Sequence, residues 1–323
     1  DEIFAKKVIV ACGGMASPKF GTDGNGYNLL KKFGHTVSEL HPALLQIKTE
    51  KPRKALKGIK HVGKATLICG GRKIKSSEGE LLFTDYGLSG PPVFNLSGDA
   101  ALALSRGEKA EISLDLLPQT DFRGLLEQME KRVLKFSHLS EENFLNGVLP
   151  KKLGYEIRRS ESTARGMTRL MKDFRFTVSG TTGFANAQVT SGGVNTGEID
   201  NGTMMSKKVK NLYITGEIMN VDGDCGGFNL QWAWCTGALA GQDAARTLKK
   251  RRTTNDFGKR HKTSAGKSSG CKKSGGKKTC GFGRRYHGYQ NFAPFHRRAK
   301  KTDVYFYGCG VSAERKECKR RKI

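Results

Sequence analysis

The chain lacks several features that would place it quickly in a protein class. None of its apolar runs approaches the ~20 residues of a membrane-spanning helix, so an integral membrane protein is not expected. Cys-x-x-Cys spacing does not occur and the histidines show no ligand-like spacing, so we predict no metal site. No signal peptide is visible. We therefore expect a cytoplasmic protein with reduced thiols and no membrane contact.

Acidic and aliphatic residues are scarce in residues 249–323. This segment has 24 Lys+Arg against 4 Asp+Glu, a net charge of +20 out of the formal +27. Stretches rich in Lys, Gly and Ser bury too little apolar surface to offset the entropy of ordering, so we predict a disordered basic tail. Basic residues alternate there with aromatic ones such as Tyr286 and Phe292. That pattern leaves open a second function, non-specific binding of nucleic acid through the tail.

Residues 1–248 have the composition of a mildly basic globular protein, and their pattern predicts an α/β fold (α+β overall). Residues 6–14 indicate a buried parallel strand that ends in a glycine turn. Short strand-like pieces in 44–117 favour a small antiparallel or barrel-like unit. Further elements are expected as a helix at 27–33, helices within 119–172, strands within 174–199, and a strand at 211–214.

The most informative segment is residues 216–231. Gly216-Glu217 ends an apolar stretch, a loop with Gly226-Gly227 follows, and a helix is expected from about Asn229 to Leu248. Backbone N–H groups at a helix start attract an anionic or electron-rich ligand. Glu217 could accept a hydrogen bond from a ribityl hydroxyl. The N–H groups around Asn229 and Leu230 could face the N1/O2 edge of a flavin.

Three other segments are weaker candidates, and each has a plain structural alternative. Gly13-Gly14 could lie beside a cofactor or form only a tight turn. The stretch 84–92 could be a binding loop or a solvated hairpin. The stretch 189–194, which contains Gly192-Gly193, could be a second loop against a ligand or a strand–turn–strand.

Several motifs together resemble one known family. They are Val8–Tyr27, His41–Leu44, Leu82–Pro92, Gln188–Val194, Thr203–Lys207 and Gly216–Gly237, in the family's order. Over about residues 3–248 the chain resembles the bacterial YhiN/BaiN-type (HI0933-like) FAD-dependent oxidoreductases. The resemblance implies a Rossmann-like FAD domain (1–45 and 185–248) interrupted by an inserted β-barrel and helical substrate domain (46–184), with 249–323 as a tail.

The resemblance also implies a cofactor and site residues. FAD is expected as cofactor and NADH or NADPH as electron donor. Residues matching the family's cofactor motifs are Gly13, Gly14, Gly216, Glu217, Gly226, Gly227, Asn229 and Leu230. Residues expected nearer the substrate are Thr84, Ser89, Gly90, Gly192 and Gly193. No catalytic residue is identified, and Tyr86 is a candidate proton donor.

The chain departs from the family's pattern at its start. The family opens with a strand–Gly-x-Gly-x-x-Gly–helix unit for the ADP diphosphate, whereas this chain enters Val8–Ala11 almost at once, as if it began inside a domain. Cys12 stands where threonine is usual. The tail has no counterpart, although residues 299–306 resemble the start of another flavoprotein type, which suggests a fused or frame-shifted sequence.

Two functions follow from the resemblance. The first is reduction of an activated C=C bond by NAD(P)H-reduced FAD, in a steroid-like enone or in a uracil ring of ribosomal RNA. The second is an inactive flavoprotein fragment, because the diphosphate-binding unit is absent from the start of the chain. The basic balance favours an RNA substrate slightly over a small molecule.

Overall fold

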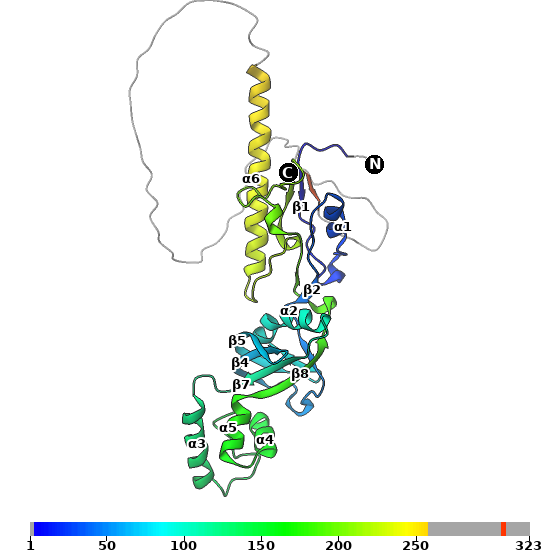
Figure 1. Cartoon of the computed structure of the whole chain (residues 1–323). Helices are drawn as coiled ribbons and strands as arrows, with labels where there is room; N and C mark the ends of the chain where they lie inside the picture. Colours follow the sequence, from blue (N-terminus) through cyan, green and yellow to red (C-terminus); the bar gives the residue numbers. More distant parts are fainter. Residues whose placement is uncertain (1–2, 258–304, 308–323) are drawn as a thin grey trace, which may run out of the picture.

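The computed structural model describes residues 3–257 and 305–307. Figure 1 shows three regions in succession. A small sheet is flanked by α6 (Phe228–Phe257) and α1 (Asn25–Lys32), a barrel with α2 (Pro91–Ser105) follows, and the helices α3 (Phe122–Lys135), α4 (Lys151–Ser160) and α5 (Ala164–Lys172) lie at the far end. Among the described residues, no helix combines the length and apolar character needed to cross a bilayer.

The small sheet has the strand order β10-β1-β11. β1 (Val8–Val10) pairs in parallel with β10 (Leu212–Ile214) on one side and with β11 (Tyr305–Tyr307) on the other. Ile9 and Val10 are buried, as the apolar run at 6–14 predicts. The predicted buried parallel strand and the strand at 211–214 are therefore confirmed.

Two helices accompany this sheet. α1 (Asn25–Lys32) begins two residues earlier than expected, and Gly34 with φ +81° follows its end. α6 (Phe228–Phe257) continues nine residues beyond the predicted end at Leu248. Residues 249–252 are Lys and Arg, which favour helix, so the first part of the predicted disordered tail is helical.

The rest of the basic tail divides in two. Tyr305–Tyr307 is the strand β11, so the prediction of disorder is wrong for these three residues as well. Aromatic residues have a high strand propensity, and β1 offers them a free edge. The remaining predictions for the tail, including the nucleic-acid-binding aromatic and basic residues, fall at 258–304 and 308–323, outside the described residues.

A closed six-stranded barrel follows, which confirms the predicted barrel-like unit. Its two long strands, β4 and β5, are ten and twelve residues, much longer than the short pieces expected. Phe83, Phe174 and Phe176 pack together inside it, the last two edge to face at 4.8 Å between centroids. In barrel order the strands are β3 (Ile47–Thr49), β6 (Gly87–Ser89), β5 (Arg72–Phe83), β4 (Lys60–Cys69), β7 (Ala110–Asp115) and β8 (Phe174–Thr181).

One helix of this region was not predicted. α2 (Pro91–Ser105) begins directly after β6, and its Val93, Leu96 and Ala100 are completely buried in the barrel core. Two prolines at its start obscured the pattern, although proline suits the first helical turn because its missing N–H has no partner there. The expected helices within 119–172 are present as α3 (Phe122–Lys135), α4 (Lys151–Ser160) and α5 (Ala164–Lys172).

A two-stranded ribbon lies between the small sheet and the barrel (Figure 1). β2 (His41–Ala43) pairs antiparallel with β9 (Val189–Ser191). The barrel strands run from Ile47 to Thr181, inside the expected range 46–184; the domain boundaries themselves stay a prediction. Short 3-10 turns complete the described chain: η1 (Pro18–Phe20), η2 (Lys54–Leu56), η3 (Phe184–Asn186), η4 (Thr196–Glu198) and η5 (Gly216–Ile218).

Candidate functional site

The carboxyl ends of β1 and β10 bring two distant glycine segments together. Thr215 donates its backbone N–H to the carbonyl of Val10 at 3.0 Å, which keeps the strands paired to their last residues. Beyond that point the chain leaves β1 through Gly13-Gly14 and leaves β10 through η5. Ligands in parallel sheets bind outside this edge of the strands, so the predicted residues Gly13, Gly14, Gly216 and Glu217 share one neighbourhood.

Thr190 of β9 ties the two segments together. Its Oγ1 accepts hydrogen bonds from the backbone N–H groups of Met15 (2.7 Å) and Ala16 (3.1 Å). Its own N–H donates to Glu217 Oε1 at 2.7 Å. Sequence reasoning placed Thr190 inside the candidate stretch 189–194 but assigned it no role. A threonine beside a glycine pair was the available signal.

Gly14 needs to be glycine because these side chains crowd it. A Cβ there would lie 2.6 Å from Glu217 Oε1 and 2.8 Å from Thr190 Cβ, well inside contact distance. Burial raises the pKa of Glu217, and its hydrogen bonds with Thr190 oppose that rise. A carboxyl group with a raised pKa beside a glycine backbone is suited to bind polar hydroxyl groups of a ligand.

Tyr27 of α1 contributes a second unpredicted group. Its side chain is buried, and its Oη has no hydrogen-bond partner among the described residues. Burial raises the pKa of Tyr27, and the nearby Glu217 and Cys12 raise it further, while the Thr190 hydroxyl opposes the rise without reaching hydrogen-bond geometry to Tyr27 Oη. A buried hydroxyl without a partner costs free energy unless a ligand or water satisfies it, which makes Tyr27 a candidate donor to a ligand.

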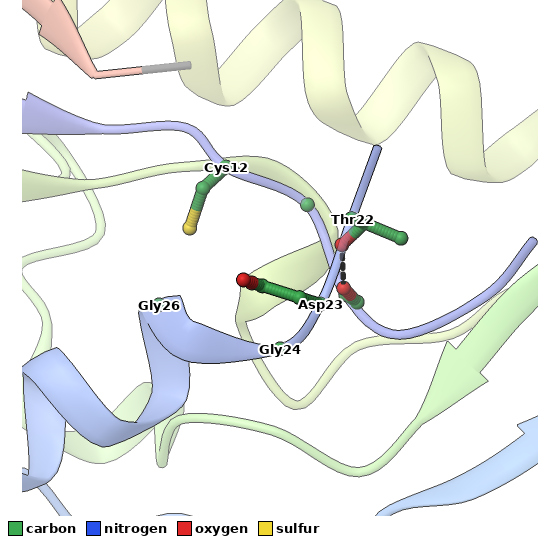
Figure 2. A pocket seen from close by; sticks show the side chains of 7 residues that line it. Cys12, Thr22, Asp23, Gly24 and Gly26 are labelled. Carbon is green, nitrogen blue, oxygen red and sulfur yellow. Dashed lines mark hydrogen bonds between the residues drawn. The ribbon is translucent and has the colours of Figure 1, made fainter. Parts of the chain in front are cut away.

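A pocket opens between the end of β1 and the start of α1. Figure 2 shows Cys12 on one side and Asp23, Gly24 and Gly26 on the other, with Thr22 donating to the carbonyl of Gly14. Asp23 accepts from the backbone N–H of Asn25 at 2.9 Å, which holds its carboxylate at the start of α1. The pocket therefore offers backbone from two glycine-rich segments to a ligand.

The first turns of α6 contact η5. Thr236 Oγ1 accepts from the N–H of Gly216 at 3.0 Å, and Trp232 Nε1 donates to its carbonyl at 3.2 Å. The Asn229 side chain accepts a hydrogen bond from the N–H of Gly223 at 2.8 Å and donates one to the Gly223 carbonyl at 2.9 Å. Asn229 thus shapes the loop with its side chain, and the first-turn N–H groups have no partner within the helix.

The loop 222–225 fastens this region to the barrel. Lys75 of β5 forms an ion pair with Asp224 at 2.7 Å, and Asn95 of α2 accepts from the N–H of Cys225 at 2.7 Å. Ser191 donates to Asp222 at 3.2 Å. Although Asp222 reaches solvent, its surroundings remove part of its hydration and raise the pKa of its carboxyl group. The predicted pair Gly226-Gly227 completes the loop.

The predicted substrate-side residues fall into two separate groups. Gly193 donates to Ser38 Oγ at 2.9 Å, and a Cβ on it would lie 2.7 Å from the carbonyl oxygen of Ile218. With φ +137° as well, it requires glycine. Gly193 therefore lies directly beside η5 and the predicted cofactor segment, whereas Gly192 lies against the backbone of Glu39 and Leu40.

Thr84, Tyr86, Ser89 and Gly90 form the second group. Thr84 Oγ1 accepts from the N–H of Gly87 at 3.0 Å, and the Tyr86 carbonyl accepts from Thr49. The Tyr86 side chain is partly exposed, Ser89 is buried in β6, and Gly90 precedes α2. No hydrogen bond within residues 3–257 joins these four to 216–231. Thr84–Gly87 forms the hairpin turn between β5 and β6, but β6 is buried between β3 and β5, so the hairpin is not the solvated one of the alternative.

No group of three or more His, Cys, Asp or Glu side chains within the described part of the chain could hold a metal ion. His35 does take part in a smaller polar cluster, in which it forms hydrogen bonds with Glu198 at 2.9 Å and with Ser206 at 2.8 Å. Ser206 also accepts from the N–H of Val209 at 2.9 Å and is buried. This cluster pins a loop and leaves no open position for a ligand.

Comparison with known proteins agrees with this geometry. Residues 1–243 match the model of the HI0933-like protein Rossmann domain family, which is of the flavoprotein oxidoreductase type. A 3-dehydro-bile acid delta(4,6)-reductase of Clostridium scindens is 38% identical over 75% of this chain and 62% of its own length. The ribosomal RNA dihydrouridine synthase of Escherichia coli is 31% identical over 74% of this chain and 60% of its own length.

A third relative is the ribosomal RNA dihydrouridine synthase of Haemophilus influenzae, 34% identical over 71% of this chain and 58% of its own length. The chain thus spans about three fifths of the length of these relatives. The relatives' names describe two kinds of molecule, a bile acid and a ribosomal RNA.

Proposed function

We propose, on the premise that this chain belongs to the HI0933-like protein Rossmann domain family, that it binds FAD and reduces an activated C=C bond with electrons from NADH or NADPH. One observation carries the proposal. Four features converge at the carboxyl ends of the parallel strands β1 and β10: Gly13-Gly14, Thr190, Glu217 and the start of α6. This is where α/β sheets bind dinucleotides.

The residues present suit a flavin dinucleotide. Tyr27 Oη is buried without a partner beside Glu217, so it can donate to a ligand oxygen. Gly13 and Gly227 have no atom within 4 Å of a would-be Cβ, so each leaves room beside the backbone. The unfilled N–H groups of the α6 first turn attract negative charge.

Each group then has a distinct role. Glu217 accepts hydrogen bonds from ribityl hydroxyls, and Thr190 holds Glu217 in place through its N–H. Trp232 and Thr236 fix Gly216 against α6, which keeps the helix start aimed at the ring. When bound, the flavin supplies hydride transfer. The N–H groups near Asn229 and Leu230 stabilise negative charge on the N1/O2 edge.

The substrate belongs to one of two classes suggested by the relatives' names: a steroid-like enone or a uracil ring in ribosomal RNA. Both contain a C=C bond polarised by a carbonyl. The net charge of +27 favours RNA, because phosphates are attracted to a basic protein. Gly193 lies beside the predicted cofactor segment, which supports Gly192-Gly193 as part of the proposed substrate side. Thr84, Ser89 and Gly90 remain proposed on resemblance, and Tyr86 remains the proposed proton donor.

Flavin retention tests the cofactor part. The purified protein is mixed with FAD, desalted and scanned for flavin absorbance, together with Glu217→Gln and the matched control Glu50→Gln on the exposed barrel surface. We expect the wild type and Glu50→Gln to stay yellow and Glu217→Gln to lose most of its flavin. A wild-type protein that emerges colourless contradicts the proposal.

Separate half-reactions test the chemistry. Flavin reduction by NADH or NADPH is followed without oxygen, and an enone steroid or a uridine-containing ribosomal RNA fragment is then added. Reoxidation by only one of them identifies the substrate class. Tyr86→Phe should leave flavin reduction unchanged and slow reoxidation by substrate. An unchanged reoxidation rate removes Tyr86 from the mechanism.

A further inference from the structure

Asp222 is an ionisable side chain that reaches solvent between the proposed cofactor and substrate segments. The next residue, Gly223, is held against Asn229 near the start of α6 by two hydrogen bonds, of 2.8 and 2.9 Å. The Asp222 carboxylate itself accepts a hydrogen bond from Ser191 Oγ at 3.2 Å. Ser191 directly precedes the predicted substrate-side pair Gly192-Gly193. Asp222 is therefore fixed on one side to the start of α6 and on the other to the end of β9.

The surroundings of Asp222 favour the protonated form of its carboxyl group. Partial burial is the largest cause of its raised pKa, and the negative charge of Asp99 on α2 adds to the rise. The hydrogen bond from Ser191, the positive charge of Lys75 on β5 and a backbone hydrogen bond oppose the rise in pKa. Lys75 forms its own ion pair with Asp224 at 2.7 Å, so its charge is shared between two carboxylates.

Two further titratable groups lie across the β2–β9 ribbon from Ser191. His41 of β2 is opposite Ser191 in register, and Glu39 Oε1 lies 3.4 Å from His41 Nε2. Glu39 therefore balances the charge of a protonated His41. The charged side chains that act on Asp222 are Asp99 and Lys75.

Reduction of a C=C bond needs a proton as well as a hydride. A general acid must reach the reacting atom and must be protonated part of the time at the working pH. Tyr86 is assigned this role by resemblance alone, and no hydrogen bond within residues 3–257 joins it to 216–231. Asp222, in contrast, lies beside both segments that are proposed to hold the reactants. Because it also reaches solvent, water can reprotonate it after each turnover.

We propose that Asp222, and not Tyr86, supplies the proton in the reduction of the C=C bond. The hydride goes to one carbon of the double bond. The O–H bond of Asp222 breaks, and its proton forms a C–H bond at the carbon next to the carbonyl group. The carboxylate that remains takes a proton from water, and the proposed NADH or NADPH supplies both electrons. The inference rests on the proposed function, and its test separates the two.

Rapid-mixing experiments compare the wild type, Asp222→Asn and the control Glu50→Gln, which makes the matching change on the exposed barrel surface. The dissociation constant for FAD, flavin reduction by NADH or NADPH, and reoxidation by the enone steroid or the RNA fragment are measured separately. We expect Asp222→Asn to slow reoxidation about a hundredfold or more, as for the loss of a general acid. The other two quantities should not change, because asparagine still accepts from Ser191. The control should match the wild type.

The pH dependence gives a readout that a structural role would not move. Reoxidation of the wild type should slow as the pH rises through the pKa of Asp222, because only the protonated carboxyl group can donate. Asp99→Asn removes a negative charge and should move this decrease to lower pH, whereas Ser191→Ala removes a hydrogen bond and should move it to higher pH. Carbon-13 NMR titration of the flavin-free protein, with the signal identified by its loss in Asp222→Asn, should give Asp222 a pKa above its ordinary value of 3.8.

The other outcomes overturn the inference in distinguishable ways. Unchanged reoxidation in Asp222→Asn, or a pH profile that neither Asp99→Asn nor Ser191→Ala shifts, rejects Asp222 as the donor and leaves the proposed function standing. An equal loss of FAD affinity and of reoxidation also rejects it, because Asp222 would then only hold the loop. An Asp222 pKa at or below the ordinary value rejects it without any flavin present. A wild type that binds no flavin, or whose reduced flavin neither substrate reoxidises, removes the proposed function and the inference with it.

Discussion

Replacing Gly14 with alanine should destabilise the protein more than its small size suggests. Gly14 is not in the left-handed region, so the added methyl group causes no backbone strain. The cost comes from its neighbours, because the Cβ would lie 2.6 Å from Glu217 Oε1 and 2.8 Å from Thr190 Cβ. Thr190 is completely buried and cannot move outward. Either the side chains shift or the end of β1 does.

The magnitude follows from what Thr190 holds. Its Oγ1 and N–H take part in three hydrogen bonds, to Met15, Ala16 and Glu217. Overpacking a buried site costs about 1–3 kcal/mol, and weakening such hydrogen bonds adds about 1 kcal/mol. We therefore expect Gly14→Ala to lower the free energy of unfolding by about 3 kcal/mol.

Gly13→Ala is the matched control at the next residue. Gly13 has φ +74° but no atom within 4 Å of a would-be Cβ. Its replacement should cost only the left-handed backbone penalty, about 1 kcal/mol. Backbone conformation alone predicts a larger loss of stability for Gly13→Ala than for Gly14→Ala. The crowding argument predicts the opposite order.

The assay is urea unfolding of the protein without added flavin, followed by tryptophan fluorescence. The sequence has two tryptophans, Trp232 and Trp234, both on α6, so the signal reports this region. A Gly14→Ala loss no larger than that of Gly13→Ala would refute the crowding argument. As a second check, Gly14→Ala and Thr190→Ala combined should cost less than the sum of the two, because they remove one shared interaction.

Three further predictions concern hydrogen-bonded polar side chains elsewhere in the described chain. Burial alone would raise the pKa of Glu198, but hydrogen bonds from Lys208, Thr36 and His35 lower it from 4.5 to about 2. The stability that this carboxylate contributes is therefore present above pH 4.5 and is lost as the pH falls towards 2. The urea midpoint should drop on acidification in the wild type, and it should drop less in Glu198→Gln. Tyr213→Phe removes the hydroxyl that donates to Asp243 at 2.8 Å, and calorimetry should show a loss of about 1–2 kcal/mol, whereas unchanged stability would mean that water replaces the bond. Asn95→Ala leaves the N–H of Cys225 without its acceptor. The loss of about 1 kcal/mol should lower the affinity for FAD about fivefold. The stability of the barrel, measured by circular dichroism, should stay close to that of the wild type.

The sequence predicts the outline of the site because its signals are local. An apolar strand followed by two glycines, and a glycine–glutamate pair before a helix, each need only a few residues to be recognised. Gly13, Gly14, Gly216 and Glu217 accordingly lie near one another. The meeting of these segments depends on strand pairing between residues about two hundred positions apart. Composition and periodicity cannot predict which distant strands pair. The resemblance to a family with the same order of motifs implies that the segments meet.

The residues that sequence reasoning missed are those whose role depends on tertiary contacts. Thr190 and Tyr27 belong to ordinary strand and helix patterns, and only the fold brings them to Glu217. α2 was missed because its two starting prolines suggested a turn. The tail was misjudged at β11, because strand formation there depends on the free edge of β1 and not on local composition.

The loop 222–225 connects the predicted cofactor segment to the barrel. It follows the predicted cofactor segment at η5, yet its polar contacts reach the barrel through Lys75 and Asn95. The ion pair is exposed and is worth at most about 1 kcal/mol, so the amide bond to Cys225 is the firmer attachment. Any shift of α2 against the small sheet must therefore move the loop that leads into α6. Under the proposed function, this loop is the part of the described chain through which a substrate at the barrel and a flavin at the start of α6 would influence each other.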